Sequence, residues 1–189
     1  MLKDNIFSME NTLPNKSEFV ILDTNMIYHL LNLNNDISKA NEARQYLNKL
    51  ANNDNIAIIP SQAWNEVNIK TENTLIGKNK KNSKEFLRNN NHVYSEATEI
   101  VKGYKSIISK IPNVYIDECN PTSKTQENAE LNRSKHNLRY ADSVIYTLAE
   151  EHNINNIVTF DYDYTNINNS SMNIYLDQDN YEKYINLNK

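Results

Sequence analysis

The seven residues FVILDTN at positions 19–25 decide the fold of this chain. The first four are all apolar, which is typical of a strand buried on both faces. The strand ends at Asp23, and apolar residues then recur with the i, i+3, i+4 spacing of a helix at Ile27, Leu30 and Leu31. Asp23 or the threonine after it is expected to cap that helix. A buried strand that leads straight into a helix is the opening unit of a parallel α/β sheet.

The same alternation of buried strands and amphipathic helices continues along the chain. Short apolar runs predict further strands at 56–59, 114–116, 157–160 and 173–176. Helical spacing predicts helices at 40–50, from 61 onward, at 93–111, in part of 120–137 and at 138–148. This alternation predicts an α/β fold with a mostly parallel sheet.

The length of 189 residues, with 39% hydrophobic residues, suits one compact domain. We expect a flexible leader at 1–17, which is polar and contains Pro14, and a single domain at 18–189 with an enlarged helical region at about 73–137. No apolar run approaches the ~20 residues that a membrane span needs. Residues 1–10 lack the continuous apolar stretch of a secretory signal, so the expected location is the cytoplasm, with no membrane attachment.

The counts of cysteine and glycine exclude several classes of site. The single cysteine, Cys119, allows neither an internal disulfide nor a thiolate metal site. With only Gly77 and Gly103, the chain has neither a P-loop nor a G-x-G-x-x-G turn. The net charge of −4 differs from the basic balance of proteins that bind nucleic acid by charge alone. Bound divalent cations would invert the local field of clustered carboxylates, so the charge does not exclude a nucleic-acid substrate.

Two acids, Asp23 and Asp161, stand where two predicted strands end. Ligands of open parallel sheets gather beyond the carboxyl ends of the strands, and neighbouring strands are only ~4.8 Å apart. If these strands are neighbours, the two carboxylates repel each other unless a divalent cation lies between them. Glu66 and Asp142 lie on predicted helices, and Asp142 is close enough to the buried side to need a partner.

Each of these acids also has an ordinary structural explanation. Asp23 fits a helix N-cap, Asp161 and its neighbour Asp163 fit turn positions, and an isolated Glu66 or Asp142 fits a solvated helix charge. The joint arrangement favours a metal site, because two strand-end acids and two helix acids occur together in one small α/β chain.

Four segments resemble the motifs of PIN-domain ribonucleases. Residues 20–25, VILDTN, resemble the opening motif of that family, and residues 59–67 resemble the segment with its second acid. Residues 141–149 are similar to a helix of the form A-D-x-x-I-x-x-x-A, and residues 158–164 are similar to the motif T-x-D-x-D-[FY]. The resemblance spans about 19–175, with a longer middle stretch than in small toxin-type members. It implies a three-layer α/β/α, PIN-like fold with a central mostly parallel sheet, and a VapC-type toxin or a related ribonuclease.

The resemblance also implies a role for each matching residue. The catalytic acids and ligands of Mg²⁺ or Mn²⁺ would be Asp23, Glu66, Asp142 and Asp161. Asp163 would be an accessory metal-site acid, and hydrogen-bonding support would come from Thr24, Asn25 and Thr159. Carboxylates suit these hard cations. A metal-bound water of lowered pKa would attack phosphorus, and a second metal at ~3.5–4 Å would stabilise the leaving oxygen.

Two sets of basic residues are candidates for contact with a phosphate backbone. The first set, Lys81, Lys84 and Arg88, lies in the enlarged region, where a solvated helix face is the ordinary alternative. The second set, Lys135 and Arg139, comes just before Asp142. We expect residues 73–91 to lie next to the acidic edge, and the helix that begins near Val93 to pack beside the sheet.

Hydrolysis of RNA, single-stranded or structured, is the leading interpretation. An aspartyl-phosphate hydrolase is one rival, but that class generally has a second aspartate two residues after the first, where this chain has Asn25. A PIN-like module that binds nucleic acid or protein without cutting is the other rival, and the retention of all four acids argues against it. An antitoxin-like protein partner and a homodimer are candidate assemblies.

Overall fold

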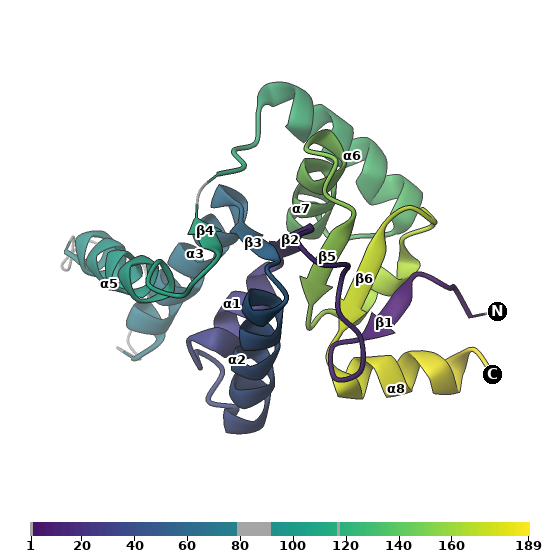
Figure 1. Ribbon diagram of the computed structural model, residues 1–189. Helices are drawn as coiled ribbons and strands as arrows, with labels where there is room; N and C mark the ends of the chain where they lie inside the picture. Colours follow the sequence, from purple (N-terminus) through teal and green to yellow (C-terminus); the bar gives the residue numbers. More distant parts are fainter. Residues whose placement is uncertain (1, 79–91, 117) are drawn as a thin grey trace.

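One parallel sheet lies at the centre of the molecule. The computed structural model describes residues 2–78, 92–116 and 118–189 (Figure 1). The described strands follow the order β1-β6-β5-β2-β3-β4, and every pairing between neighbours is parallel. Their bounds are β1 (Ile6–Ser8), β2 (Phe19–Leu22), β3 (Ile56–Ile59), β4 (Val114–Ile116), β5 (Asn156–Thr159) and β6 (Asn173–Leu176).

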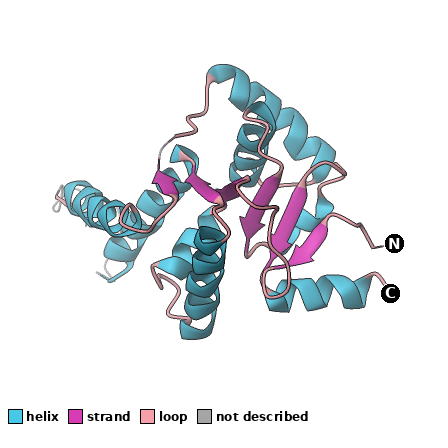
Figure 2. Ribbon diagram, in the orientation of Figure 1, coloured by secondary structure: helices cyan, strands magenta, loops and turns pink. Residues whose placement is uncertain are grey.

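Helices cover both faces of the sheet. The helices are α1 (Thr24–Leu30), α2 (Ile37–Asn52), α3 (Ser61–Lys78), α5 (Val93–Ile108), α6 (Ser123–His136), α7 (Tyr140–Glu151) and α8 (Gln178–Leu187), with a 3₁₀ helix η1 (Tyr162–Asn166). In the view of Figure 1, α6 and α7 lie above the sheet, and α1, α2 and α8 lie below it. Figure 2, with strands in magenta and helices in cyan, shows the same layers. The predicted three-layer α/β/α fold is therefore confirmed.

The central strands carry apolar side chains on both faces because helices cover both. Val20, Ile21 and Leu22 of β2 are fully buried, as are the neighbouring β5 residues Ile157 and Val158. The apolar run that predicted β2 therefore forms a central strand. The parallel register pairs Leu22 with Val158, which brings the carboxyl ends of β2 and β5 together.

The segment 1–17 differs from the loose leader that we expected. Ile6–Ser8 forms the edge strand β1, which pairs in parallel with β6. Ile6 and Met9 are buried in the core, and the Met9 amide donates a 2.8 Å hydrogen bond to the Leu176 carbonyl. Three residues are too short for a period-2 pattern to show in the sequence. Pairing with β6, distant in the chain, orders this segment.

Within the region at about 73–137, most of the residues that the structure describes are helical. Helix α3 continues to Lys78, α5 buries Val93 and Ala97, and β4 joins the edge of the sheet. Helix α5 packs mainly against α3 and so reaches the sheet through that helix. The basic residues Lys81, Lys84 and Arg88, like the rest of 79–91, lie outside the described residues.

The turn between α6 and α7 sets the position of Asp142. Helix α6 begins with a capping box in which Thr122 and Thr125 exchange hydrogen bonds, and it ends at Asn137 in the left-handed conformation, with φ of 51°. Helix α7 then starts at Tyr140 and packs back along α6. Asp142 thus lies in the first turn of α7.

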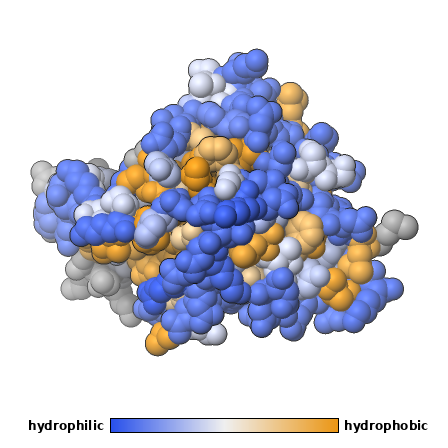
Figure 3. Space-filling view, viewed as in Figure 1, coloured by the Kyte–Doolittle hydropathy of each residue, from blue (hydrophilic) through white to orange (hydrophobic). Residues whose placement is uncertain are grey.

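Hydrophilic side chains cover most of the face in Figure 3, with hydrophobic patches between the helices. Throughout 2–78, 92–116 and 118–189, no helix combines the length and the apolar character that a membrane crossing requires.

Candidate active site

The two strand-end acids lie side by side at the carboxyl edge of the sheet. Asp23 directly follows β2, and Asp161 comes two residues after the end of β5. Because β2 and β5 are paired, both carboxylates belong to one site. Asp23 is fully buried, and the Asp161 side chain is 10% exposed. Each is also an N-cap: Asp23 accepts from the Asn25 amide and Asp161 from the Asp163 amide.

Several hydrogen-bond donors hold the Asp23 carboxylate in place. Thr159 Oγ1 donates to Asp23 Oδ2 at 2.8 Å, and the Tyr164 hydroxyl donates to Oδ1 at 3.2 Å. Burial raises the pKa of Asp23 above its ordinary value, and the nearby Asp161 raises it further. The Thr159 hydrogen bond lowers that pKa, so it partly offsets the burial.

Thr159 and Asn25 each connect the two strand-end acids. The Asp161 amide donates to Thr159 Oγ1 at 2.8 Å, while the same hydroxyl donates to Asp23. Asn25 Nδ2 lies 3.4 Å from Oδ2 of both Asp23 and Asp161. Both residues therefore contact the acids that the resemblance implied they support, and their role in the activity stays a prediction.

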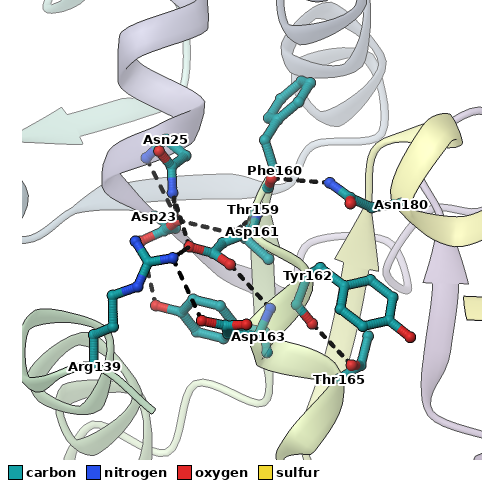
Figure 4. A network of polar contacts seen from close by, with 11 residues as sticks. Asp23, Asn25, Arg139, Thr159, Phe160, Asp161, Tyr162, Asp163, Thr165 and Asn180 are labelled. Carbon is teal, nitrogen blue, oxygen red and sulfur yellow. Dashed lines mark hydrogen bonds and ion pairs between the residues drawn. The ribbon is translucent and has the colours of Figure 1, made fainter. Parts of the chain in front are cut away.

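Arg139 is a cation that approaches this cluster. Its Nη2 lies 3.7 Å from Asp161 Oδ2 and 3.5 Å from Asp163 Oδ2. Figure 4 shows the guanidinium reaching across to both acids. The Arg139 side chain is 72% exposed. These ion pairs are therefore screened by water, and Arg139 remains accessible at the mouth of the site.

Glu66 joins the site from α3. The Thr24 hydroxyl donates a hydrogen bond to Glu66 Oε2, so the first residue of α1 holds an acid of another helix. Burial raises the pKa of Glu66, Asp23 raises it further, and Arg139 opposes the shift. Thr24, which the resemblance assigned to hydrogen-bonding support, thus contacts one of the acids directly.

Of the four acids, Asp142 has the fewest side-chain hydrogen bonds among the described residues. Its residue is 6% exposed, and Oδ2 has no hydrogen-bond partner among the described residues. Burial raises the pKa of Asp142 to about 8, and the charges of Asp23, Asp161 and Glu66 add to the rise. A buried carboxylate oxygen without a donor is costly in an apolar setting, so this position suits a cation.

The structure brings together most of the residues that the sequence singled out. The members of the cluster are Asp23, Thr24, Asn25, Glu66, Arg139, Asp142, Thr159, Asp161 and Asp163. Lys135 lies in the last turn of α6, exposed, and makes no described contact with the acids. Tyr164, which we had not assigned to the site, is fully buried and contacts Asp23. Its position at the end of the T-x-D-x-D-Y segment could have identified it from the sequence as a residue of the site.

The donor set fits a hard divalent cation, since it is made of carboxylates and includes an unpartnered, buried oxygen. Among the described residues, no three acidic, histidine or cysteine side chains converge closely enough to bind one ion directly. Magnesium keeps several waters and takes only one or two protein carboxylates. A magnesium site therefore needs fewer than three direct protein ligands, and the other acids would act through water.

Fold and site together define an α/β protein with an acidic site at the carboxyl edge of a parallel sheet. A model of the PIN domain matches residues 20–169, and the chain belongs to the PIN-domain family. The resemblance seen in its motifs is thereby confirmed.

The fold of this chain is also similar to that of a solved structure. That structure is a chain from the crystal structure of VapBC2 from Rickettsia felis bound to a DNA fragment from their promoter. The two chains share 18% identity with a TM-score of 0.51, and the match covers 84% of this chain and 98% of that one. Curated protein sequences give no match. At this identity the likeness concerns the fold alone.

Proposed function

We propose that this protein is a Mg²⁺- or Mn²⁺-dependent ribonuclease that hydrolyses phosphodiester bonds. The observation that carries the proposal is the cluster of Asp23, Glu66, Asp142 and Asp161 at one edge of the sheet, with Asp142 Oδ2 unpartnered among the described residues. Arg139 is the only cation that the described ion pairs bring to these acids. Such an excess of negative charge is stable in a partly buried site when divalent cations bind there.

In this proposal the catalytic acids have different roles in binding the metal. Asp23 and Asp161 are held by fixed donors and would be the oriented ligands. Asp142 and Glu66 would complete the site from α7 and α3, and Asp163 would assist from the rim. The bound metal would supply a water of lowered pKa and neutralise charge on the phosphate. Thr159, Asn25 and Thr24 would keep the carboxylates in position.

The substrate contacts belong to the mouth of the site. Arg139 is exposed beside Asp161, where it can reach a phosphate of the bound strand. Lys135 is exposed in the last turn of α6 and would add a longer-range attraction. RNA as the substrate rests on the resemblance to PIN-domain ribonucleases. The contacts assigned to Lys81, Lys84 and Arg88 rest on the positive charge of these side chains.

Two rival functions make different predictions for the same acids. A PIN-like module that binds without cutting would need neither an oriented Asp23 nor a buried, unpartnered Asp142. An aspartyl-phosphate hydrolase would need a nucleophilic Asp23 open to substrate, but this residue is fully buried behind Thr159 and Tyr164.

A small antitoxin-like protein partner, or a second copy of this chain, is the companion proposal on assembly. It draws on the fold likeness to a chain of VapBC2, which the crystal structure shows bound to promoter DNA. Co-expression with any small reading frame that adjoins the gene, followed by measurement of mass in solution, tests it. A chain that stays monomeric and unaccompanied contradicts both assemblies.

A cleavage assay with four combinations of substrate and metal tests the activity. The purified chain is incubated with labelled RNA or DNA of the same sequence, with Mn²⁺ or with a chelator. We expect cleavage of RNA with Mn²⁺ and none with the chelator. Equal cleavage with the chelator contradicts the metal requirement, preferential cleavage of DNA contradicts the substrate, and no cleavage of a folded sample contradicts the enzyme.

A further inference from the structure

A groove of about 470 Å³ opens beside Glu66. It is lined by Tyr28, Glu66, Ile69, Lys70, Asn73 and Thr74. Tyr28 comes from α1 and the other five residues from α3. Glu66 therefore belongs both to the acidic cluster and to the wall of this groove. A strand of nucleic acid that leaves the cluster past Glu66 would enter the groove directly.

Lys70 gives the groove a positive charge that no carboxylate neutralises among the described residues. Its Nζ lies 3.8 Å from the centre of the Tyr28 ring and donates to the Asn34 side-chain oxygen. An ammonium has three donors, so these contacts hold the group in place and leave a donor available. Glu66 is one helical turn before Lys70, but its carboxylate accepts from Thr24.

Tyr28 contributes a second donor to the same groove. The ring is half-buried, and its hydroxyl has no partner among the described residues. Burial raises the pKa of the Tyr28 hydroxyl, and the charges of Glu66 and Asp23 raise it further, so it keeps its proton at neutral pH. The hydroxyl can therefore donate to an anion that lies between the groove and the acidic cluster.

We propose that the groove of Tyr28 and Lys70 is a subsite for a backbone phosphate of single-stranded RNA next to the cleaved bond. The Lys70 ammonium would contact the non-bridging oxygens, and the Tyr28 hydroxyl would donate a second hydrogen bond. A phosphate fits better than a base because Lys70 already covers the Tyr28 ring, and most of the other lining side chains are polar. Arg139 lies beside Asp161 and Asp163, and Lys70 lines the same groove as Glu66, so two cations would then be available near the acids.

This inference rests on the proposed function, but a binding measurement tests it apart from cleavage. The full-length chain with Asp23→Asn, which is expected not to cut, is titrated with a labelled single-stranded RNA at several salt concentrations and constant Mg²⁺. Lys70→Gln, Lys70→Arg and Tyr28→Phe are added to that background. The matched control is Lys16→Gln, since Lys16 pairs with Asp54 at 3.1 Å and both lie just before β2 and β3, at the opposite edge of the sheet.

Loss of one phosphate contact on a single strand reduces the slope of log K against log[salt] by about 0.7. We expect Lys70→Gln to show that reduction and to weaken binding about threefold to tenfold at low salt, whereas Lys70→Arg restores most of both. Tyr28→Phe is expected to weaken binding less and to leave the slope unchanged, because it removes no charge. A purely structural cation–π pair would not move the salt slope.

Two results overturn the subsite. One is equal affinity and equal slope for Lys70→Gln and Lys16→Gln, and the other is failure of Lys70→Arg to restore either quantity. Both can occur in a chain that still cleaves RNA, so they leave the proposed function intact. Absence of cleavage by the unmodified chain, with the Lys70 effect on binding preserved, overturns the enzyme and leaves the subsite standing.

Discussion

Asp23 and Asp177 occupy equivalent places at the same edge of the sheet, yet their surroundings differ. Each directly follows a strand, each caps a helix, and each is fully buried. Asp177 has a lysine partner, with Lys39 Nζ at 3.4 Å, and Asn180 Nδ2 donates to it at 2.5 Å. Asp23 has hydroxyl and amide donors but no cationic partner in the described part of the chain.

The difference shows what separates a structural acid from a candidate ligand. A buried carboxylate that carries its own cation is already neutralised within the protein. Asp23 instead lies near the acids Glu66, Asp142 and Asp161. The charge of Asp23 raises the pKa of Glu66 and of Asp142, and the charge of Asp161 raises the pKa of Asp23. Four acids at one place leave a negative charge that a divalent cation can neutralise. The following predictions use this comparison.

The largest effect is expected from the same substitution at the two positions. Asp23→Asn keeps size and shape but removes a ligand charge, so RNA cleavage should fall by more than about 100-fold. Asp177→Asn should keep cleavage per folded molecule within about threefold, although it removes the ion pair with Lys39 and lowers stability. Initial rates on a labelled RNA, normalised by the folded fraction, measure both. Equal losses at the two positions would refute the distinction.

Metal should stabilise the fold through the Asp23 cluster. A ligand at 100 times its Kd adds about 2.7 kcal/mol to the free energy of unfolding. Melting curves with increasing Mn²⁺ should therefore shift upward for the unmodified chain and for Asp177→Asn. Asp23→Asn should lose most of the shift, because one oriented ligand is gone. An unchanged shift in Asp23→Asn would place the metal elsewhere.

The pH dependence of stability should report Asp142. Its pKa of about 8 lies above the ordinary value of 3.8, so the folded chain binds more protons than the unfolded chain between these values. The free energy of unfolding of the metal-free chain should fall as pH rises through that range, by up to about 1.4 kcal/mol per pH unit. It should stop falling above about pH 8.

Asp142→Asn should flatten that slope, since the amide does not titrate. Denaturation at about pH 5 to about pH 8 with a chelator measures it. Asp23 and Glu66 have raised pKa values as well, so some slope should remain. A slope as steep in Asp142→Asn as in the unmodified chain would contradict the assignment.

The smallest effect is expected at Tyr164. Tyr164→Phe removes the 3.2 Å hydrogen bond to Asp23 Oδ1 and keeps the buried ring. Such a bond typically contributes about 1 kcal/mol, which corresponds to a loss of cleavage of about fivefold. Thr159, whose bond to Asp23 is 2.8 Å and which also accepts from Asp161, offers the comparison. Thr159→Val should cost more than Tyr164→Phe, and the reverse order would show that the phenol is the principal support.

The local sequence determined the central strands of this protein and the acids that follow them. The apolar runs of β2 and β5 are recognisable because both faces of a central parallel strand are buried, so the middle residues of each strand are apolar. The acids after these strands and the first-turn position of Asp142 follow from the same local pattern. Local pattern could not identify the edge strand β1, or helix α8, whose one buried apolar side chain is Tyr184.

Tertiary structure decided which acids act together. Thr159 and Asp23 are 136 residues apart, and only the pairing of β2 with β5 brings the hydroxyl to the carboxylate. The neutralisation of Asp177 likewise depends on Lys39 of α2, which lies 138 residues away in the chain. Hydrogen bonds and ion pairs act over a few ångströms, whatever the separation in sequence. The chain therefore encodes its acids locally, and the packing of distant segments fixes whether each acid has a partner.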